Sequence, residues 1–412
     1  MVPPDAHPLL ASVIASVTLA GVAFGRLPFV PLDRAGFALV GSAALLVVGV
    51  VDLHEAAALI DAEVLVLLFG LMLLNEALAE AGAFRTLTRW ATRRAGGPFA
   101  LLVALSVAAG GLSALFLNDT IVIMLTPLVI QLTRQLGVPP LPYLLALATA
   151  ANVGSVATIT GNPQNLIVSV QGGIGYLPFA AALVPVAIVG LAVVIAVIAW
   201  VYRRDLAGGP FRGEPATVAP MPRRPLAVAV GWAIALLVAF VAGAPVATAA
   251  LVVGAGVLLT AGDAGRRVLA RVDLSLLTLF AGLFVVVGAL GHTGVTSAAA
   301  ATLGAGWASG IASLTAVTAV ASNLFSNVPA VLLLAPLVAE AGAGSAGFLT
   351  LAMASTLAGN LTVVGSVANL IVVEGARKAG VTVGFWAYLR VGLPITLLTL
   401  AFGAGWLAWR GG

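Results

Sequence analysis

Residues 152–165 read NVGSVATITGNPQN and interrupt an apolar run that extends over residues 141–170. Pro163 has no backbone N–H and clashes with the preceding turn, so a regular helix should stop just before it and then restart. The restarted half-helix exposes free N–H groups, which form a partly positive cradle for an oxygen-rich solute or an anion. The same stretch supplies the candidate ligands Thr158, Thr160, Gly161, Asn162 and Asn165. The sequence therefore predicts a broken helix with a polar binding face.

The chain around this stretch has the composition of an integral membrane protein. Of its 412 residues, 61% are hydrophobic and 8% are charged, whereas a soluble domain carries about 25% charged residues. This composition excludes a soluble globule and a disordered chain. Cys is absent, which excludes disulfides, thiol catalysis and iron–sulfur clusters, and the three His residues share no ligand spacing. We therefore expect no metal site and no other cofactor.

Apolar segments long enough to cross a bilayer define the expected layout. They lie at residues 9–25, 36–52, 57–82, 141–170, 178–201, 226–243, 246–262, 274–291, 346–373 and 385–408. Two longer apolar stretches, 99–136 and 303–339, each carry a polar break in the middle. We predict that both are re-entrant hairpins, because irregular backbone at membrane depth is tolerated where protein buries it or a cavity borders it. The alternative is a pair of ordinary spans joined by a short turn.

The basic residues predict the orientation. In this layout all of the 19 Lys and Arg residues except Arg410 fall on one side, which the positive-inside rule makes the cytoplasmic side. Both termini are then expected outside, in a bacterial inner membrane, and segment 9–25 is a retained span because no basic n-region precedes it. The high pI reflects this topology, so no nucleic-acid partner is expected. Glu76 and Glu80 are expected to form ion pairs near Arg85 and Arg89.

The two halves of the chain resemble each other across a polar linker at residues 202–225. Residues of the first half that recur 209 or 204 positions later include Asn118 at Asn327, Pro127 at Pro336, Thr158 at Thr362, Gly161 at Gly365 and Asn165 at Asn369. Each half contains an odd number of spans, so equivalent segments should run in opposite directions. We predict an all-α polytopic membrane protein with two inverted five-helix repeats, residues 1–201 and 226–412. Each repeat carries a re-entrant hairpin and a broken transmembrane helix.

Inverted repeats with broken helices are typical of secondary transporters, whose binding site lies near the midplane between the repeats. The candidate ligands outside the first break are Asn118, Asp119, Thr120, Ser326, Asn327, Thr362, Gly365, Ser366 and Asn369. For any single one of them, hydrogen bonding between helices is the alternative role. An enzyme is not expected, because no nucleophile–base pair, HExxH motif or pair of core aspartates is present. No GxxxxGK[ST] loop is present either, so nucleotide-driven transport would need an external ATPase partner.

Asp119 is a carboxyl group inside an apolar run, at the expected tip of the first hairpin. A charged carboxylate costs several kcal/mol at the membrane centre, so it should be protonated, paired or reached by water. No Lys or Arg lies within the predicted core to neutralise it. We predict that Asp119 loads and releases a proton as the site alternates its access. The alternative is a fixed acceptor that caps backbone N–H groups of the hairpin.

These motifs resemble those of the ion transporter superfamily, and within it the arsenite efflux permeases (the ArsB group) and neighbouring bacterial anion permeases. The resemblance spans nearly the whole chain. It is carried by four segments in the same order: residues 116–127, 154–165, 326–329 and 364–369. It implies a scaffold domain and a transport domain with paired hairpins, and a substrate held between hairpin tips and unwound helices.

The resemblance points to two substrate classes. Asn118-Asp119 is similar to the arsenite branch, whereas residues 160–165 are similar to the general anion permeases and symporters. Arsenous acid is mostly uncharged near neutral pH, so its site needs hydrogen-bonding groups without a cationic clamp. The leading expectation is proton-coupled efflux of arsenite or antimonite. The alternative is a sodium- or proton-coupled permease for another small anion, such as a dicarboxylate, sulfate or silicate.

Overall fold

The structure is a computed structural model that describes residues 7–25, 30–86, 96–207, 223–294 and 310–411, with the single residues 209, 211, 296 and 298 and the short segments 301–302 and 306–308. Its regular elements within these residues are helices, so the all-α fold class is confirmed. Parts of the expected 202–225 linker, and Arg89, lie outside the described residues.

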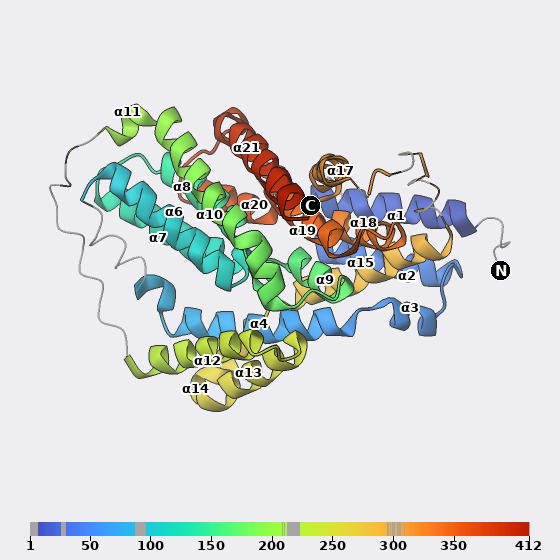
Figure 1. Cartoon of the computed structure of the whole chain (residues 1–412). Coiled ribbons are helices and arrows are strands. Elements are labelled where there is room, and N and C mark those ends of the chain that lie inside the picture. The colour runs from blue at the N-terminus through green and yellow to red at the C-terminus, as the bar shows by residue number, and fades with distance from the viewer. Residues whose placement is uncertain are drawn as a thin grey trace.

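The first half of the chain forms a series of helices that ends at the linker (Figure 1). They are α1 (His7–Phe24), α2 (Arg34–Val47), α3 (Leu53–Leu59), α4 (Ala62–Glu80), α6 (Pro98–Leu115), α7 (Asn118–Gln135), α8 (Leu141–Ser155), the 3-10 turn η2 (Ile159–Gly161), α9 (Pro163–Gln171), α10 (Tyr176–Val201) and α11 (Arg203–Leu206).

The second half repeats this order of long, short, paired and broken helices. Its elements are α12 (Arg223–Val241), α13 (Val246–Thr260), α14 (Asp263–Ala270), α15 (Leu274–His292), α17 (Ile311–Phe325), α18 (Asn327–Glu340), α19 (Gly344–Ala358), the 3-10 turn η3 (Val363–Gly365), α20 (Val367–Lys378) and α21 (Phe385–Gly411). The recurrence supports the predicted duplication.

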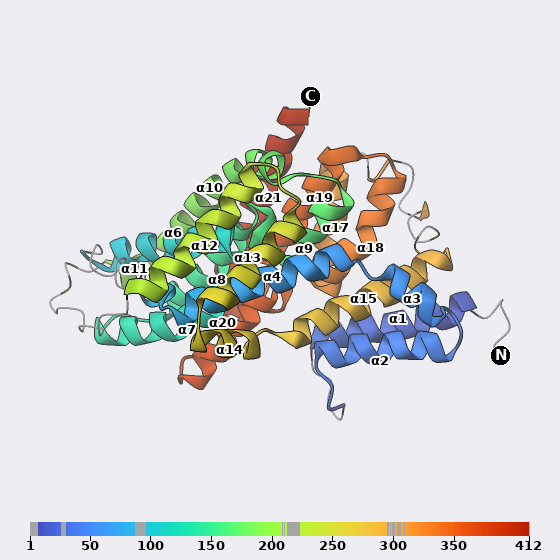
Figure 2. The same cartoon turned by 90° about the horizontal axis from the view of Figure 1, so that it is seen from below.

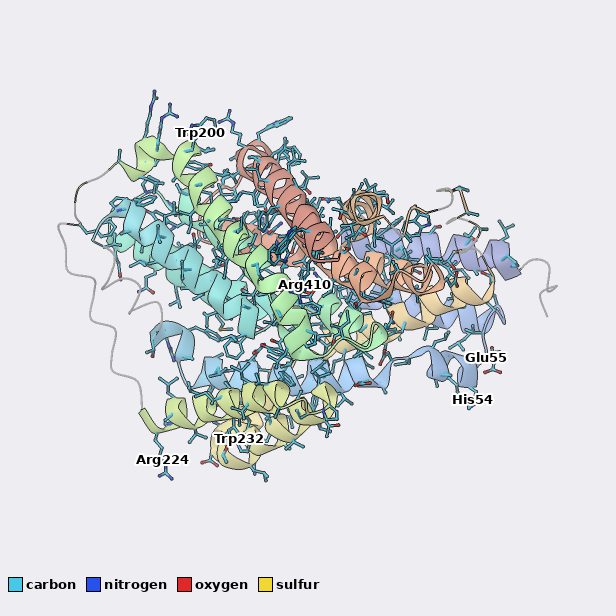
Figure 3. All side chains as sticks on the ribbon, in the orientation of Figure 1. His54, Glu55, Trp200, Arg224, Trp232 and Arg410 are labelled. Atoms are coloured by element: carbon cyan, nitrogen blue, oxygen red, sulfur yellow. The ribbon has the colours of Figure 1, made fainter. Side chains whose placement is uncertain are left out.

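The outer surface of the helices is apolar, as a lipid environment requires. Six described helices are long and apolar enough to cross a membrane: α4, α6, α10, α12, α15 and α21. Val47 is 87% exposed and Leu259 is 85% exposed, and Trp200 projects from the end of α10 in Figure 3. Large apolar surfaces of this kind would be unfavourable in water but are satisfied by acyl chains.

Both stretches predicted as hairpins form pairs of helices joined by short corners, and their re-entrance into the membrane stays a prediction. Helix α6 is followed by α7 after Phe116 and Leu117, and α17 is followed by α18 after Ser326 alone, which adopts a left-handed φ of 74°. Both broken spans are also present. The second break forms although it lacks a proline, so the glycines and polar residues around η3 suffice to interrupt the helix.

The prediction of one continuous span over residues 57–82 is wrong. The structure divides this segment between α3 and α4 at Ile60 and Asp61. The Asp61 side chain accepts a hydrogen bond of 3.1 Å from the Val64 backbone N–H and thereby starts α4 as its N-cap. His54 and Glu55 on α3 lie at the periphery of the molecule (Figure 3).

The helices divide into two groups that meet along one boundary. The scaffold group contains α1, α2, α4, α12, α13 and α15, and the hairpin group contains α6–α10 and α17–α21. Figure 2 shows α4, α13 and α15 along one side and the hairpin helices behind them. These groups match the scaffold and transport domains that the resemblance implies.

Contacts between the halves follow an exchange pattern. Helix α4 packs on α13 while its counterpart α15 packs on α2, and α7 packs on α20 while its counterpart α18 packs on α9. Such swapped pairing is what a two-fold relation between equivalent elements produces. The opposite orientation of the two repeats in the membrane, their boundaries and the outside position of the termini stay predictions.

Ion pairing of Glu80 also joins the halves. Its carboxylate accepts hydrogen bonds from Arg267 Nε at 2.8 Å and from Arg271 Nη1 at 2.6 Å, at the end of the α14 segment. The expected pairing of this carboxylate is confirmed, but the expected partner Arg85 is wrong. The packing of α14 on α4 places cations of the second half nearer than those that follow in sequence.

Candidate functional site

The two helix breaks are built by the same side-chain device. Asn165 Nδ2 donates to the backbone carbonyls of Ser155 and Thr158, both at 2.9 Å. At the equivalent position, Asn369 Nδ2 donates to the carbonyls of Gly359 and Thr362, at 2.7 and 3.1 Å. The carbonyls freed where each helix unwinds therefore find a buried amide donor, which offsets the cost of breaking the helix inside the protein.

A cavity of about 50 Å³ lies where both hairpin tips and both restarted helices meet the scaffold group. Its lining residues are Val22, Arg34, Asn118, Asp119, Pro163, Gln164, Leu276, Leu279, Phe280, Ser326, Asn327, Val328, Pro329, Ser366 and Val367. Residues that are far apart in sequence therefore share one small chamber at the boundary between the two helix groups.

Five of the residues predicted from the sequence line this cavity: Asn118, Asp119, Ser326, Asn327 and Ser366. They come from both hairpin tips and from the start of α20. Asn118 is 4% exposed and Asn327 is 7% exposed, whereas Asp119 is half-buried. The structure thus brings together the two halves of the predicted site at the hairpins.

The other predicted residues do not line the cavity, and several of them hydrogen-bond within the helix breaks. Thr158 and Thr160 lie with their hydroxyl oxygens 3.1 Å apart, and Thr158 also donates to the Ala114 carbonyl of the hairpin helix α6. Outside the described lining are Thr120, Thr158, Thr160, Gly161, Asn162, Asn165, Thr362, Gly365 and Asn369. A Cβ on Gly161 would overlap the Ser155 carbonyl, so this glycine permits close backbone approach.

Asn152 is a residue that the sequence reasoning did not select, and it connects the two breaks. Its Oδ1 accepts hydrogen bonds from Asn118 Nδ2 at 3.0 Å and Ser366 Oγ at 3.1 Å, and its Nδ2 donates to Asn360 and Asn369, both at 3.0 Å. The side chain is fully buried. The sequence feature that could have identified Asn152 is a polar amide within an otherwise apolar helix, one helical turn before the break.

Thr356 occupies the position equivalent to Asn152 and makes the reciprocal connection. Its Oγ1 accepts hydrogen bonds from Asn162 Nδ2 at 3.0 Å and from Gln164 Nε2 at 3.1 Å. In the amide orientation that satisfies both of its polar atoms, Asn327 accepts from the same Gln164 nitrogen at 3.3 Å. A buried amide therefore joins the tip of each hairpin to a broken helix: Asn118 contacts Asn152, and Asn327 contacts Gln164.

The expectation that no cation lies near Asp119 is wrong. Arg34, the first residue of α2, lines the same cavity and interacts electrostatically with the Asp119 carboxyl. Sequence reasoning assigned Arg34 to a cytoplasmic loop, because it follows a short gap between apolar segments. The packing of α2 on α15 instead brings the start of α2 to the cavity wall.

The electrostatics of the cavity favour oxygen atoms. Helices α7, α9, α18 and α20 all begin among or beside its lining residues, so their partly positive N-termini converge there. Among the described residues, no side chain caps the start of α7, α18 or α20. Their N–H groups remain available to an oxygen-bearing ligand, and Asp119 supplies a compensating acceptor.

Comparison with known proteins agrees with this geometry. The model of the citrate transporter family CitMHS matches residues 19–358. The chain belongs to this family. It is therefore a membrane transporter, and the resemblance to the ion transporter superfamily is confirmed.

Individual members and solved structures extend the comparison. The silicon efflux transporter LSI3 of Oryza sativa subsp. japonica is 30% identical, over 95% of this chain and 97% of its own. A putative transporter arsB of Dictyostelium discoideum is 26% identical over 43% of this chain and 31% of its own. The YdaH transporter of Alcanivorax borkumensis shares the fold, with a TM-score of 0.60, 16% identity and 98% of each chain covered.

Proposed function

We propose that this CitMHS-family protein is a secondary active transporter that exports arsenite or antimonite in exchange for protons across a bacterial inner membrane. The observation that carries the proposal is the shared cavity, in which two hairpin tips and two helix starts present amide, hydroxyl and backbone N–H groups around one carboxyl and one arginine. Such a mixed set of donors and acceptors suits a small solute that carries several hydroxyl groups.

The size of the cavity favours a small oxyacid over a larger carboxylate. A water molecule needs about 10–15 Å³ of such space, so the cavity volume of about 50 Å³ corresponds to roughly four waters. Arsenous acid has three oxygens around one central atom and matches this space. A citrate-sized anion would require the hairpin tips to separate from the scaffold helices. Arsenic–thiol bonding is excluded because the chain has no Cys.

Proton coupling is assigned to Asp119. It is the carboxyl group among the described lining residues, and it lies in the first turn of α7 at the hairpin tip. A protonated Asp119 donates a hydrogen bond, whereas the carboxylate only accepts. Proton and solute therefore compete for the same group, which is the requirement for exchange.

Silicic acid is the second candidate substrate. It shares with arsenous acid a compact shape, several hydroxyl groups and little charge near neutral pH. The observation that favours it is the similarity to the rice silicon efflux transporter over nearly the full length of both chains. Both termini lie outside in the proposed topology. Nucleotide-driven transport would need an external ATPase partner, because the chain has no GxxxxGK[ST] loop.

The test is transport by the purified chain in proteoliposomes with an imposed proton or sodium gradient. Arsenite, antimonite, silicic acid, sulfate, succinate and citrate are compared as substrates in parallel. We expect accumulation of arsenite or antimonite driven by the proton gradient, and silicic acid transport if the second candidate holds. Sodium-driven uptake of succinate or citrate, with no movement of the uncharged oxyacids, would contradict the proposal.

A further inference from the structure

We infer that Arg34 holds the empty carrier in place by its electrostatic attraction to the Asp119 carboxylate at the shared cavity, and that a proton or a solute at Asp119 releases this hold. The inference rests on the proposed function, because it takes Asp119 as the group that the proton and the solute share. It assigns to Arg34 a positioning role, which acts through Asp119.

The two residues belong to different helix groups. Arg34 begins α2 in the scaffold group, and Asp119 lies in the first turn of α7 in the hairpin group. Both are half-buried and line the same cavity. Among the described lining residues they are the two titratable groups, and they interact electrostatically although no direct ion pair joins them.

The surroundings leave Arg34 as the dominant charge that favours the carboxylate. Asp273, the N-cap of α15, also acts on Asp119 with like charge, but it is exposed and its carboxylate already accepts a hydrogen bond of 3.1 Å from the Leu276 N–H. The elements α9, α18 and α20, which complete the wall, contribute amides, hydroxyls and apolar groups to the described lining. The attraction between Arg34 and Asp119 is therefore the larger of the two charge interactions that reach Asp119 from the scaffold group.

This arrangement makes movement depend on occupancy. Separating a half-buried carboxylate from its cation leaves two unpaired charges, which is strongly unfavourable in a low-dielectric environment. Protonation of Asp119 removes the attraction. A hydroxylated solute between the two groups donates to Asp119 and accepts from Arg34, and so replaces it. The loaded carrier can then leave this position, whereas the empty one is retained.

Coupled exchange requires that the empty, deprotonated carrier does not move. If the empty, deprotonated carrier could move freely, a proton would cross in one direction and the carrier would return without solute, which is an uncoupled proton leak. The attraction between Arg34 and the Asp119 carboxylate suppresses that return. Loss of the Arg34 charge should therefore uncouple proton movement from solute movement. Exchange of solute for solute across the membrane, without a gradient, should remain possible.

The experiment measures proton entry and solute flux in proteoliposomes that contain the full chain. Proton entry is followed with a trapped pH-sensitive dye, first without solute and then with arsenite, at a series of external pH values. The variants are Arg34→Gln, Arg34→Lys and the control Arg204→Gln, which removes an exposed charge on α11. For Arg34→Gln we expect a solute-independent proton leak raised by about tenfold, a size typical of coupling between two sites, and a flattened pH profile of flux.

The conservative and double variants separate this role from a structural one. Arg34→Lys keeps the charge on a shorter side chain, so coupling should persist with a pH profile displaced to higher pH, because the weaker pairing retains the proton longer. In the Asp119→Asn background, Arg34→Gln should change neither the leak nor the pH profile. Arg204→Gln should behave like the parent chain.

Each other outcome of this experiment overturns either the role of Arg34 or the proposed function as well. A parent chain that couples protons, together with an Arg34→Gln variant of unchanged leak and pH profile, overturns the role of Arg34 and leaves the proposed function standing. A parent chain without proton coupling overturns both. If Arg34→Gln does not fold, an unchanged pH profile in Arg34→Lys overturns the inference instead. An added effect of Arg34→Gln in the Asp119→Asn background shows that Arg34 does not act through Asp119, and this also overturns the inference.

Discussion

Replacing Asn152 with Ala should separate the two helix breaks from each other. The change removes four buried hydrogen bonds, which link Asn152 to Asn118, Asn360, Asn369 and Ser366. Side-chain hydrogen bonds inside membrane proteins contribute on average about 0.6 kcal/mol each. The four together give about 2.4 kcal/mol, and buried partners left without a new hydrogen bond increase this loss. We therefore expect the free energy of unfolding to fall by about 2–4 kcal/mol.

Asn75→Ala is the matched control. Asn75 is also an Asn on a membrane helix, 1% exposed, and its side-chain nitrogen and oxygen have no hydrogen-bond partner within the described part of the chain. The two substitutions remove the same atoms from equally buried positions, so the difference between them isolates the hydrogen-bond network around Asn152. The free energy of unfolding should fall clearly less for Asn75→Ala.

Unfolding can be followed in mixed detergent with increasing SDS through the fluorescence of the seven Trp residues, since a thiol-reactive dye has no target in a chain without Cys. Transport should fall together with stability for Asn152→Ala, because Asn118 at the cavity loses its acceptor. If both alanine variants lose the same free energy of unfolding, Asn152 is an ordinary packed residue, and its hydrogen bonds between the two breaks do not stabilise the protein.

Three further substitutions test separate parts of the molecule. Asp119→Asn should abolish proton-driven flux while the protein stays folded in detergent, and wild-type flux with unchanged pH dependence would refute its role. Gly161→Ala should lower the thermal midpoint of unfolding and the flux together, because the added Cβ overlaps the Ser155 carbonyl; Gly111→Ala, where a Cβ meets open space, is its control. Glu80→Gln should cost only about 0.5–1 kcal/mol of unfolding free energy despite losing two ion pairs, since both arginine side chains are more than half exposed. A several-fold larger loss in SDS titration would contradict this.

The helices and the two helix breaks could be predicted because they depend on the local amino-acid composition. Apolar length defines the helices, and the Gly, Pro and Asn positions around residues 161–165 and 365–369 define the breaks. The equivalence of Asn165 and Asn369 follows from the internal repeat, and their matching hydrogen bonds to freed carbonyls agree with it. Each of these features depends on residues that are close in sequence, so a single sequence is enough to predict them.

The cavity wall could be predicted only in part, because it depends on pairings across about half of the chain. Asn152 begins the polar interruption at residues 152–165, but its partners Asn360 and Asn369 become apparent only in the structure, where α8 packs near α20. Charge counting assigned Arg34 to the aqueous side and could not show that the first turn of α2 borders the cavity. The same limitation explains the wrong partner for Glu80, since proximity in sequence predicts contact only within one helix.

The two halves share a frame but not their chemistry, and this asymmetry bears on how the proposed exchange works. Asp119 on the first hairpin corresponds to Val328 on the second, and Pro163 corresponds to Val367, yet all four residues line the same cavity. A duplicated frame supplies two equivalent sets of hydrogen-bonding corners, which suits a solute with several hydroxyl groups. A second carboxyl at the position of Val328 would place two like charges in about 50 Å³ and raise the cost of the empty state. With one carboxyl and one arginine, the cavity is neutral when empty and becomes positive when protonated. One proton per cycle is therefore the number that this lining can bind at its own carboxyl group.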